Sequence, residues 1–226
     1  MSQAAKAAAE VVGPHYDAAM IMAARALTRK AVADIAAGIR PGMSEAEGLE
    51  HARAVLAEAG LLRGWHAIYV RFGTNTLMNY GAEGSPDVVL GENDIFFVDI
   101  GPVWRDWEGD AGDTFVTGDD PEMHAIARDV KVLFRRVQDQ WRAEGLTGEA
   151  LYAYADAEAC AMGWVLNLAM PGHRLSDFPH SALHKGYLSQ SGFTPSPGLW
   201  VLEVQIRHPT RPFSAFYEDL LLADTQ

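Results

Sequence analysis

The sequence predicts a single α+β domain with a curved, mostly antiparallel sheet and helices on its outer face. First, its segments run as two helices, several strands, two more helices and again several strands. Second, 226 residues with 49% hydrophobic and 21% charged content are ordinary for a globular protein and sufficient for a sizeable core. Third, no low-complexity linker divides the chain. We therefore expect one domain at 14–226, after an N-terminal extension at 1–13.

Two helices are predicted in the first half of the chain. Apolar residues fall at helical spacing from Pro14 to Ala37, where Pro14 suits a helix start and Gly38 a helix end. Ser44 and Glu47 form a capping box, which opens a second helix that reaches Gly60. Strand-like runs follow at 66–72 and 96–100.

The second half of the chain repeats this order. Pro121 starts a long amphipathic helix to about Glu144, and Thr147 caps another that reaches about Met162. The remainder is rich in strand-forming residues, with apolar runs at 164–168, 199–206 and 213–222.

Composition excludes several classes of protein. A formal net charge of -12 argues against nucleic acid or an anionic membrane as a partner. The single cysteine, Cys160, rules out an internal disulfide and a cysteine-based zinc site, and its alanine-rich surroundings predict a buried thiol. No stretch approaches the ~20 apolar residues that a membrane span needs, so we expect a cytoplasmic protein.

A hairpin near the middle of the chain carries the most informative residues. An apolar run ends in Asp99, the turn Gly101-Pro102 follows, and Asp110 lies eleven positions after Asp99, just before a second apolar run at 114–116. A carboxylate inside an apolar strand costs on the order of several kcal/mol unless it is paired or bound to a cation. These two acids therefore meet either basic partners or a metal.

Three further residues have the chemistry to join them. His173 follows an apolar strand, and Glu203 and Glu218 lie within the apolar runs near the C-terminus. Each has an ordinary interpretation alone, as a solvated strand acid or a histidine in a turn. Together, four acids and one histidine form an oxygen-rich set that suits two divalent cations of the manganese, cobalt or iron type. Four carboxylates would not share a pocket in ionised form without such charge.

The order and spacing of these residues resemble the superfamily of methionine aminopeptidase, aminopeptidase P, prolidase and creatinase, which has the pita-bread fold. The shared pattern is an Asp-x-Gly strand, a second Asp eleven residues later, a Gly-His element with another histidine seven positions on, and two late glutamates. The resemblance covers the chain from about Pro14 onward and corresponds to the catalytic domain alone. The matching positions are Asp99, Gly101, Asp110, Thr114, Phe115, Gly172, His173, His180, Glu203 and Glu218.

The resemblance implies two divalent metal ions, Mn, Co or Fe, with Zn also compatible, and a role for each ligand. Asp99 would chelate one ion, and Asp110 and Glu218 would bridge both. His173 and Glu203 would complete the second site. A water or hydroxide between the metals would attack an amide carbonyl, and Glu203 would shuttle the proton.

The substrate side of the site departs from the family. Where the peptidases carry a histidine before the first Asp strand, this chain has Asn79, which cannot act as an acid. His66 is a candidate to stand in for it. Prolidases and aminopeptidase P carry an arginine two residues before the last glutamate, where this chain has Phe216. We expect retained metal ligands and an altered substrate site, with substrate-binding residues His66, Asn79, Trp107, His180 and Phe216. Of these, His180 would hydrogen-bond the substrate or the oxyanion.

The leading functional hypothesis is a dinuclear-metal hydrolase that cleaves an amide bond in a short peptide or small molecule, as an aminopeptidase or dipeptidase does. Two alternatives stay open. The first is a metal-dependent enzyme for a small non-peptide metabolite, because creatinase performs C–N chemistry on this scaffold, there without metal. The second is a non-catalytic binding protein, against which the retention of all five ligands counts. Relatives often dimerise, so a homodimer also stays open.

Overall fold

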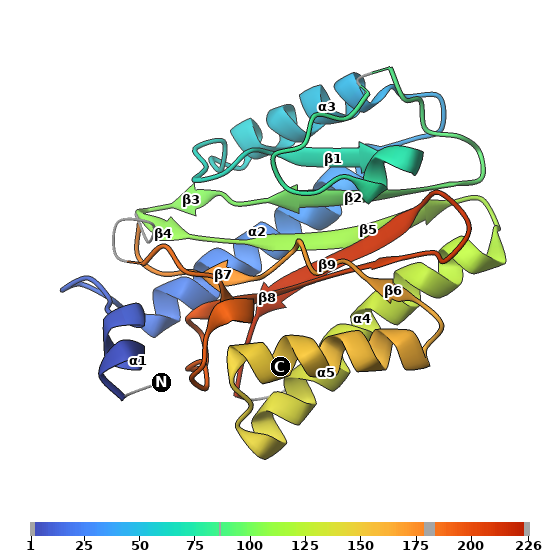
Figure 1. Cartoon of the computed structure of the whole chain (residues 1–226). Coiled ribbons are helices and arrows are strands. Elements are labelled where there is room, and N and C mark those ends of the chain that lie inside the picture. Colours follow the sequence, from blue (N-terminus) through green and yellow to red (C-terminus); the bar gives the residue numbers. More distant parts are fainter. Residues whose placement is uncertain (1–2, 86, 179–183, 224–226) are drawn as a thin grey trace.

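The computed structural model describes residues 3–85, 87–178 and 184–223, and it confirms an α+β architecture built on one antiparallel sheet (Figure 1). The strand order is β1-β2-β5-β9-β8-β6, β7 pairs with β8, and each of these pairs is antiparallel. A small hairpin, β3-β4, connects β2 to β5. The strands are β1 (Tyr69–Phe72), β2 (Asp94–Ile100), β3 (Val103–Trp104), β4 (Trp107–Glu108), β5 (Ala111–Thr117), β6 (Val165–Leu166), β7 (His173–Arg174), β8 (Trp200–Arg207) and β9 (Ser214–Leu220).

Capping residues begin the main helices. Ser44 and Glu47 form the predicted capping box, and the Thr147 side chain accepts a hydrogen bond from a first-turn amide. The helix predicted from Pro14 begins instead after Asp17, because the Asp17 side chain caps it. Within the described part of the chain, no helix is long and apolar enough to cross a membrane. The helices are α1 (Gln3–Ala9), α2 (Ala18–Gly38), α3 (Glu45–Glu58), α4 (Pro121–Glu144) and α5 (Gly148–Ala161), with 3-10 turns at Gly73–Leu77 and Leu188–Gln190.

The four longer helices pack in two pairs against the sheet. In Figure 1, α2 and α3 lie by the β1–β2 end of the sheet, and α4 and α5 lie by the β8–β9 end. Successive strand residues point to opposite faces, so Asp99 and Glu203, which alternate with the helix-facing residues, project to the other face. The buried strand residues that pack with the helices include Phe96, Val98 and Ile100 of β2 and Leu202, Val204 and Ile206 of β8.

The prediction of a buried thiol at Cys160 was wrong, because this side chain is exposed. Helix α5 buries a stripe that includes Leu151, Ala155 and Ala159. Cys160 follows the last of these by one position, which is about 100° around a helix with 3.6 residues per turn. The alanine-rich composition did not reveal which face of α5 is buried.

Candidate metal centre

One rung of the sheet aligns three of the predicted acids on the face opposite the helices. Asp99 of β2 pairs with Gly112 of β5, which pairs in turn with Glu218 of β9. Glu218 then pairs with Glu203 of β8. Directly paired residues of antiparallel strands project to the same face. Gly112 leaves room among the acids, since a Cβ at this position would lie 2.4 Å from Phe216 Cε1 and 3.1 Å from Glu218 Oε1.

Asp110 lies at the centre of the cluster, one residue before β5. Its Oδ1 lies 3.0 Å from Nε2 of His66, and its Oδ2 lies 2.8 Å from Nε2 of His173. Strand β7 brings His173 to the site by pairing it with Val201, two positions before Glu203. Nε2 of His173 consequently lies 3.3 Å from Oε1 of Glu203.

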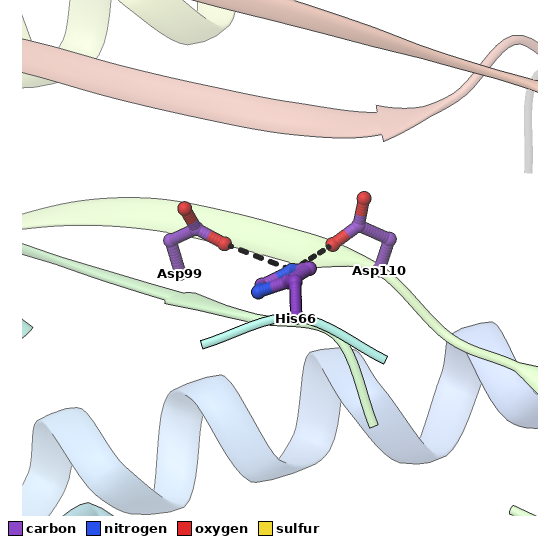
Figure 2. Close-up of side chains that lie close together, drawn as sticks. All are labelled: His66, Asp99 and Asp110. Carbon is purple, nitrogen blue, oxygen red and sulfur yellow. Dashed lines mark hydrogen bonds and ion pairs between the residues drawn. The ribbon is translucent and has the colours of Figure 1, made fainter. Parts of the chain in front are cut away.

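Two overlapping groups of side chains have the spacing of a metal site. His66, Asp99 and Asp110 form one group, and Asp110, His173 and Glu218 form the other; within each group the ligand atoms lie within 4.8 Å of one another. Figure 2 shows His66 between the two carboxylates of the first group, with Nε2 3.5 Å from Asp99 Oδ1. Asp110 belongs to both groups, as expected of a carboxylate shared by two ions.

Burial and hydrogen bonding indicate that the residues present fit divalent cations. Asp99, Asp110, Glu203 and Glu218 are all at most 8% exposed. Oε1 of Glu218 accepts no hydrogen bond from the described residues, and Oδ2 of Asp110 contacts only Nε2 of His173 among their ion pairs. Across the described ranges, the ion pairs of these acids involve the two histidines and neither lysine nor arginine. Carboxylates concentrated in this way are stabilised by bound cations, and a mixed carboxylate and imidazole set suits first-row divalent metals.

The pKa values of the acids reflect their crowding. Burial raises the pKa of Asp99 to about 6 and that of Glu203 to about 7. Burial, together with the charges of Asp110 and Asp99, raises the pKa of Glu218 well above its usual range. Asp110 differs, because hydrogen bonds from the two histidines outweigh its burial and lower its pKa to about 2. Asp110 is therefore the acid that ionises most readily, which suits a residue shared by two cations.

The two histidines titrate above their usual range. Burial lowers the pKa of each ring, but the neighbouring carboxylates outweigh this effect. Asp99 and Asp110 raise the pKa of His66 to about 9, and Asp110 with Glu203 raises that of His173 to about 9. A metal must displace the Nε2 proton, so metal binding at this cluster releases protons and strengthens as the pH rises.

A cavity of about 960 Å³ opens onto the cluster. Its walls include the acids and both histidines, together with Trp65, Tyr80 and parts of segments 168–171 and 184–190. Burial raises the pKa of Tyr80 to about 12, so the phenol keeps its proton and can donate a hydrogen bond at neutral pH. The volume is that of a site for a small-molecule ligand or a short peptide.

Comparison with known proteins identifies the family. The pattern of "Metallopeptidase family M24" matches residues 19–220 of this chain. The chain belongs to metallopeptidase family M24. This confirms the superfamily that the sequence motifs resemble. No curated protein matches the sequence of this M24 chain significantly.

Solved structures support the M24 assignment at the level of the fold. A prolidase from Pyrococcus furiosus superposes with a TM-score of 0.75 and 17% identity, over 99% of this chain and 68% of the other. A prolidase from Pyrococcus horikoshii OT3 superposes with a TM-score of 0.72 and 16% identity, over 98% of this chain and 65% of the other. A methionine aminopeptidase from Thermotoga maritima superposes with a TM-score of 0.71 and 15% identity, over 90% of this chain and 92% of the other. The pita-bread fold is thereby confirmed, and the chain spans about two thirds of the length of these prolidases.

The M24 chain brings its predicted metal ligands together, whereas only part of its predicted substrate residues line the cavity. His66 lies among the acids and lines the cavity. Asn79, Trp107 and Phe216 are not among the described residues that line it. His180 lies outside the described residues. The roles assigned to all of these side chains stay predictions.

The three residues that do not line the cavity make their contacts within the fold. Oδ1 of Asn79 accepts hydrogen bonds from Asn167 at 2.8 Å and from Arg207 at 3.1 Å. Trp107 packs against a tyrosine ring in a buried cluster. Phe216 is fully buried against a neighbouring phenylalanine beside the acids, where prolidases have an arginine. Among the residues that the structure describes, neither Asn79 nor position 216 therefore supplies a polar group to the cavity.

Tyr80 is not among the predicted site residues, yet it lines the cavity with its ring 5.9 Å from that of His66. A signal was present, because Tyr80 directly follows Asn79, the position aligned with the substrate-side histidine of the M24 peptidases. His66 is predicted as a substrate residue alone, but it also lies close to Asp99 and Asp110.

Proposed function

We propose that this chain is a hydrolase with a two-metal site, which cleaves an amide bond in a short peptide or a small amide. One observation carries the proposal: four buried carboxylates and two histidines converge around Asp110 at the wall of a cavity. Ion pairs with the two histidines alone would leave the buried Oε1 of Glu218 without a hydrogen-bond partner among the described residues.

The residues divide the work of the reaction. Asp99, Asp110, His173 and Glu218 would hold the metals, and Asp110, which belongs to both groups, and Glu218 would be shared between them. The bound cations would lower the pKa of a water molecule and polarise the substrate carbonyl. Glu203, which lines the cavity, would accept the proton of the attacking water and deliver it to the leaving amine.

A short peptide is the first substrate class to test. Structural neighbours include prolidases, an X-Pro aminopeptidase and a methionine aminopeptidase, all of which bear names of peptide-cleaving enzymes. The phenol of Tyr80 would donate a hydrogen bond to such a substrate, and His180 would contact the carbonyl oxygen at the reacting centre.

A small non-peptide metabolite is the second substrate class, and a specific observation favours it. The amide of Asn79 is bonded to Asn167 and Arg207, and Phe216 replaces the prolidase arginine with an apolar ring. A peptide bound in a site without these two polar groups would make fewer polar contacts than in a typical peptidase.

Turnover by metal-reconstituted protein tests the proposal. The chain would be stripped of metal, loaded with Mn²⁺, Co²⁺, Fe²⁺ or Zn²⁺, and assayed against Xaa-Pro dipeptides, methionine-initial peptides and small amides. Metal-dependent hydrolysis of peptides supports a peptidase, and hydrolysis of non-peptide amides alone supports the metabolite enzyme. Failure to bind any of the four metals would reject the two-metal hydrolase in favour of a binding protein.

A further inference from the structure

Two histidines approach Asp110 in the same way, one at each carboxylate oxygen. Nε2 of His66 lies 3.0 Å from Oδ1, and Nε2 of His173 lies 2.8 Å from Oδ2. Each ring also lies near a second acid, with His66 3.5 Å from Asp99 and His173 3.3 Å from Glu203. The two sides of Asp110 are therefore built alike, with one imidazole and one further carboxylate on each.

The second ring nitrogen of each histidine contacts the backbone. Nδ1 of His66 lies 2.5 Å from the carbonyl oxygen of Ala67, and Nδ1 of His173 lies 2.8 Å from that of Arg174. A carbonyl oxygen is an acceptor, so Nδ1 of each ring is the donor. In a neutral ring the lone pair of Nε2 then faces carboxylate oxygens, which is repulsive unless Nε2 is protonated or a metal ion binds both groups. Metal-binding histidines have this arrangement, because the Nδ1 hydrogen bond fixes the tautomer and aims Nε2 at the metal.

Packing holds the ring of His66 in this position. A Cβ at Gly101 would lie 2.2 Å from Cδ2 of His66, so the ring occupies space that a side chain at 101 would need. The Trp65 ring contacts both histidine rings, with centroids 4.4 Å from His66 and 5.0 Å from His173. Trp65 is itself fixed by a hydrogen bond from Nε1 to the carbonyl oxygen of Gly109. A nitrogen held this firmly is preorganised for coordination.

His66 is poorly accessible to a substrate. Its side chain is 3% exposed, compared with 17% for His173. We infer that His66 is a protein ligand of the metal ion held by Asp99 and Asp110, so that each ion has one imidazole ligand. This inference rests on the proposed two-metal site and goes beyond it, because the sequence resemblance supplies a histidine for the second ion alone.

An imidazole at each ion has a consequence for metal choice. Carboxylate and water ligands suit Mn²⁺ and Mg²⁺, whereas imidazole favours Fe²⁺, Co²⁺ and Zn²⁺. The site held by His66, Asp99 and Asp110 therefore discriminates against Mn²⁺ more strongly than a site made of oxygen ligands alone.

Isothermal titration calorimetry of the metal-free protein with Co²⁺ tests the inference. The wild-type protein is expected to bind two ions. His66→Ala is expected to raise the dissociation constant of one ion by more than about tenfold and leave the other unchanged, because a lost ligand costs at least as much as a lost outer partner. His173→Ala is expected to weaken the other ion. His184→Ala is the matched control, since it removes a histidine from the same cavity wall and leaves both constants unchanged.

Proton NMR of the Co²⁺-loaded protein separates a ligand from a residue that merely supports the fold. Each imidazole bound to Co²⁺ gives a strongly shifted, exchangeable Nδ1–H signal, because that proton lies close to the paramagnetic ion. We expect two such signals in the wild-type protein and one in His66→Ala. The wild-type spectrum decides by itself if the variant does not fold.

The outcomes distinguish this inference from the proposed function. Two bound Co²⁺ ions with a single shifted imidazole signal would overturn the role of His66 and leave the two-metal hydrolase intact. Unchanged dissociation constants in a folded His66→Ala variant would do the same. A wild-type protein that binds no Co²⁺ would reject the two-metal site and the inference with it.

Discussion

Glu203 of β8 and Glu218 of β9 are direct cross-strand partners, and their side chains project to the same face of the sheet. Like charges in this position are destabilising, and both residues are buried. Burial raises the pKa of both carboxyls, which reduces the repulsion by keeping them protonated. Cations would allow both to ionise, so metal binding and folding stability are linked at this pair.

The metal-free protein is expected to lose stability as the pH rises. A carboxyl whose pKa is raised by folding contributes most to the stability of the fold when the pH is below its unfolded pKa of about 4. This stability is lost as the pH rises through the folded pKa. For Asp99 and Glu203 this loss extends to about pH 6 and about pH 7. His66 and His173, with raised pKa values of about 9, add stability below about pH 6.5 that is lost by about pH 9. Thermal unfolding of the metal-free protein should therefore give a Tm that falls as the pH rises from about 4 to about 9.

Added Co²⁺ should reverse this decline. The rise in Tm on adding Co²⁺ is expected to be larger at about pH 8 than at about pH 5.5, because fewer protons must be displaced from the ligands. An equal rise in Tm on adding Co²⁺ at both pH values would contradict the proposed linkage.

Asp110 has the opposite effect on the metal-free protein. Its lowered pKa of about 2 contributes stability that is lost as the pH falls from about 4 to 2.

Asp110→Asn is expected to abolish hydrolysis and weaken both metal sites. The amide has lost the negative charge and one of the two oxygens that face the histidines, so each dissociation constant should rise by at least about a hundredfold, the upper end for an outer partner. Metal content after dialysis and peptide turnover would be measured together. Asp113→Asn is the control, because Asp113 lies three residues further on, within β5, and pairs with Lys131 outside the metal cluster. Wild-type metal content in Asp110→Asn would exclude a bridging role.

The hairpin that carries Asp99 and Asp110 could be predicted because its determinants are local. An apolar run, a Gly-Pro turn and a second run specify β2 and β5, and an acid inside such a run already indicates an unusual partner. The position of His66 could not be predicted in this way. It lies in a bend before β1, and its approach to the acids depends on packing with Trp65 and on the absence of a side chain at Gly101.

The orientation of single side chains was the other limit. Asn79 was expected at the substrate because of its place in the motif, yet its amide is held by Asn167 and by Arg207 of β8, which are distant in sequence. Cys160 was expected in the core because an alanine-rich helix has no clear polar face. For Asn79 a contact between distant segments decides the orientation, and for Cys160 the packing of the whole helix decides which face is buried; the local pattern contains neither.

Gly112→Ala is expected to destabilise the fold and weaken metal binding. The new Cβ would lie 2.4 Å from Phe216 Cε1 and 3.1 Å from Glu218 Oε1, so the buried ring and the carboxylate would have to move. Overpacking of this kind costs about 1–3 kcal/mol, measurable by chemical unfolding of the metal-free protein. Gly91→Ala is the control, because a Cβ there would make an ordinary contact of 3.5 Å with Asp94. Equal stability of the two variants would show that Gly112 is not needed for the spacing of the acids.

Tyr80→Phe is expected to raise KM while metal content stays unchanged. The Tyr80 ring packs against His66 and Tyr69, and phenylalanine keeps both ring contacts. The hydroxyl, whose pKa is raised by burial to about 12, is the group removed, and the loss of one hydrogen bond to substrate corresponds to about a two- to tenfold rise in KM. Tyr187→Phe is the matched control, since Tyr187 lines the same cavity. A fall in kcat at constant KM would instead place the phenol at the reacting carbonyl, because an interaction made in the transition state alone changes kcat.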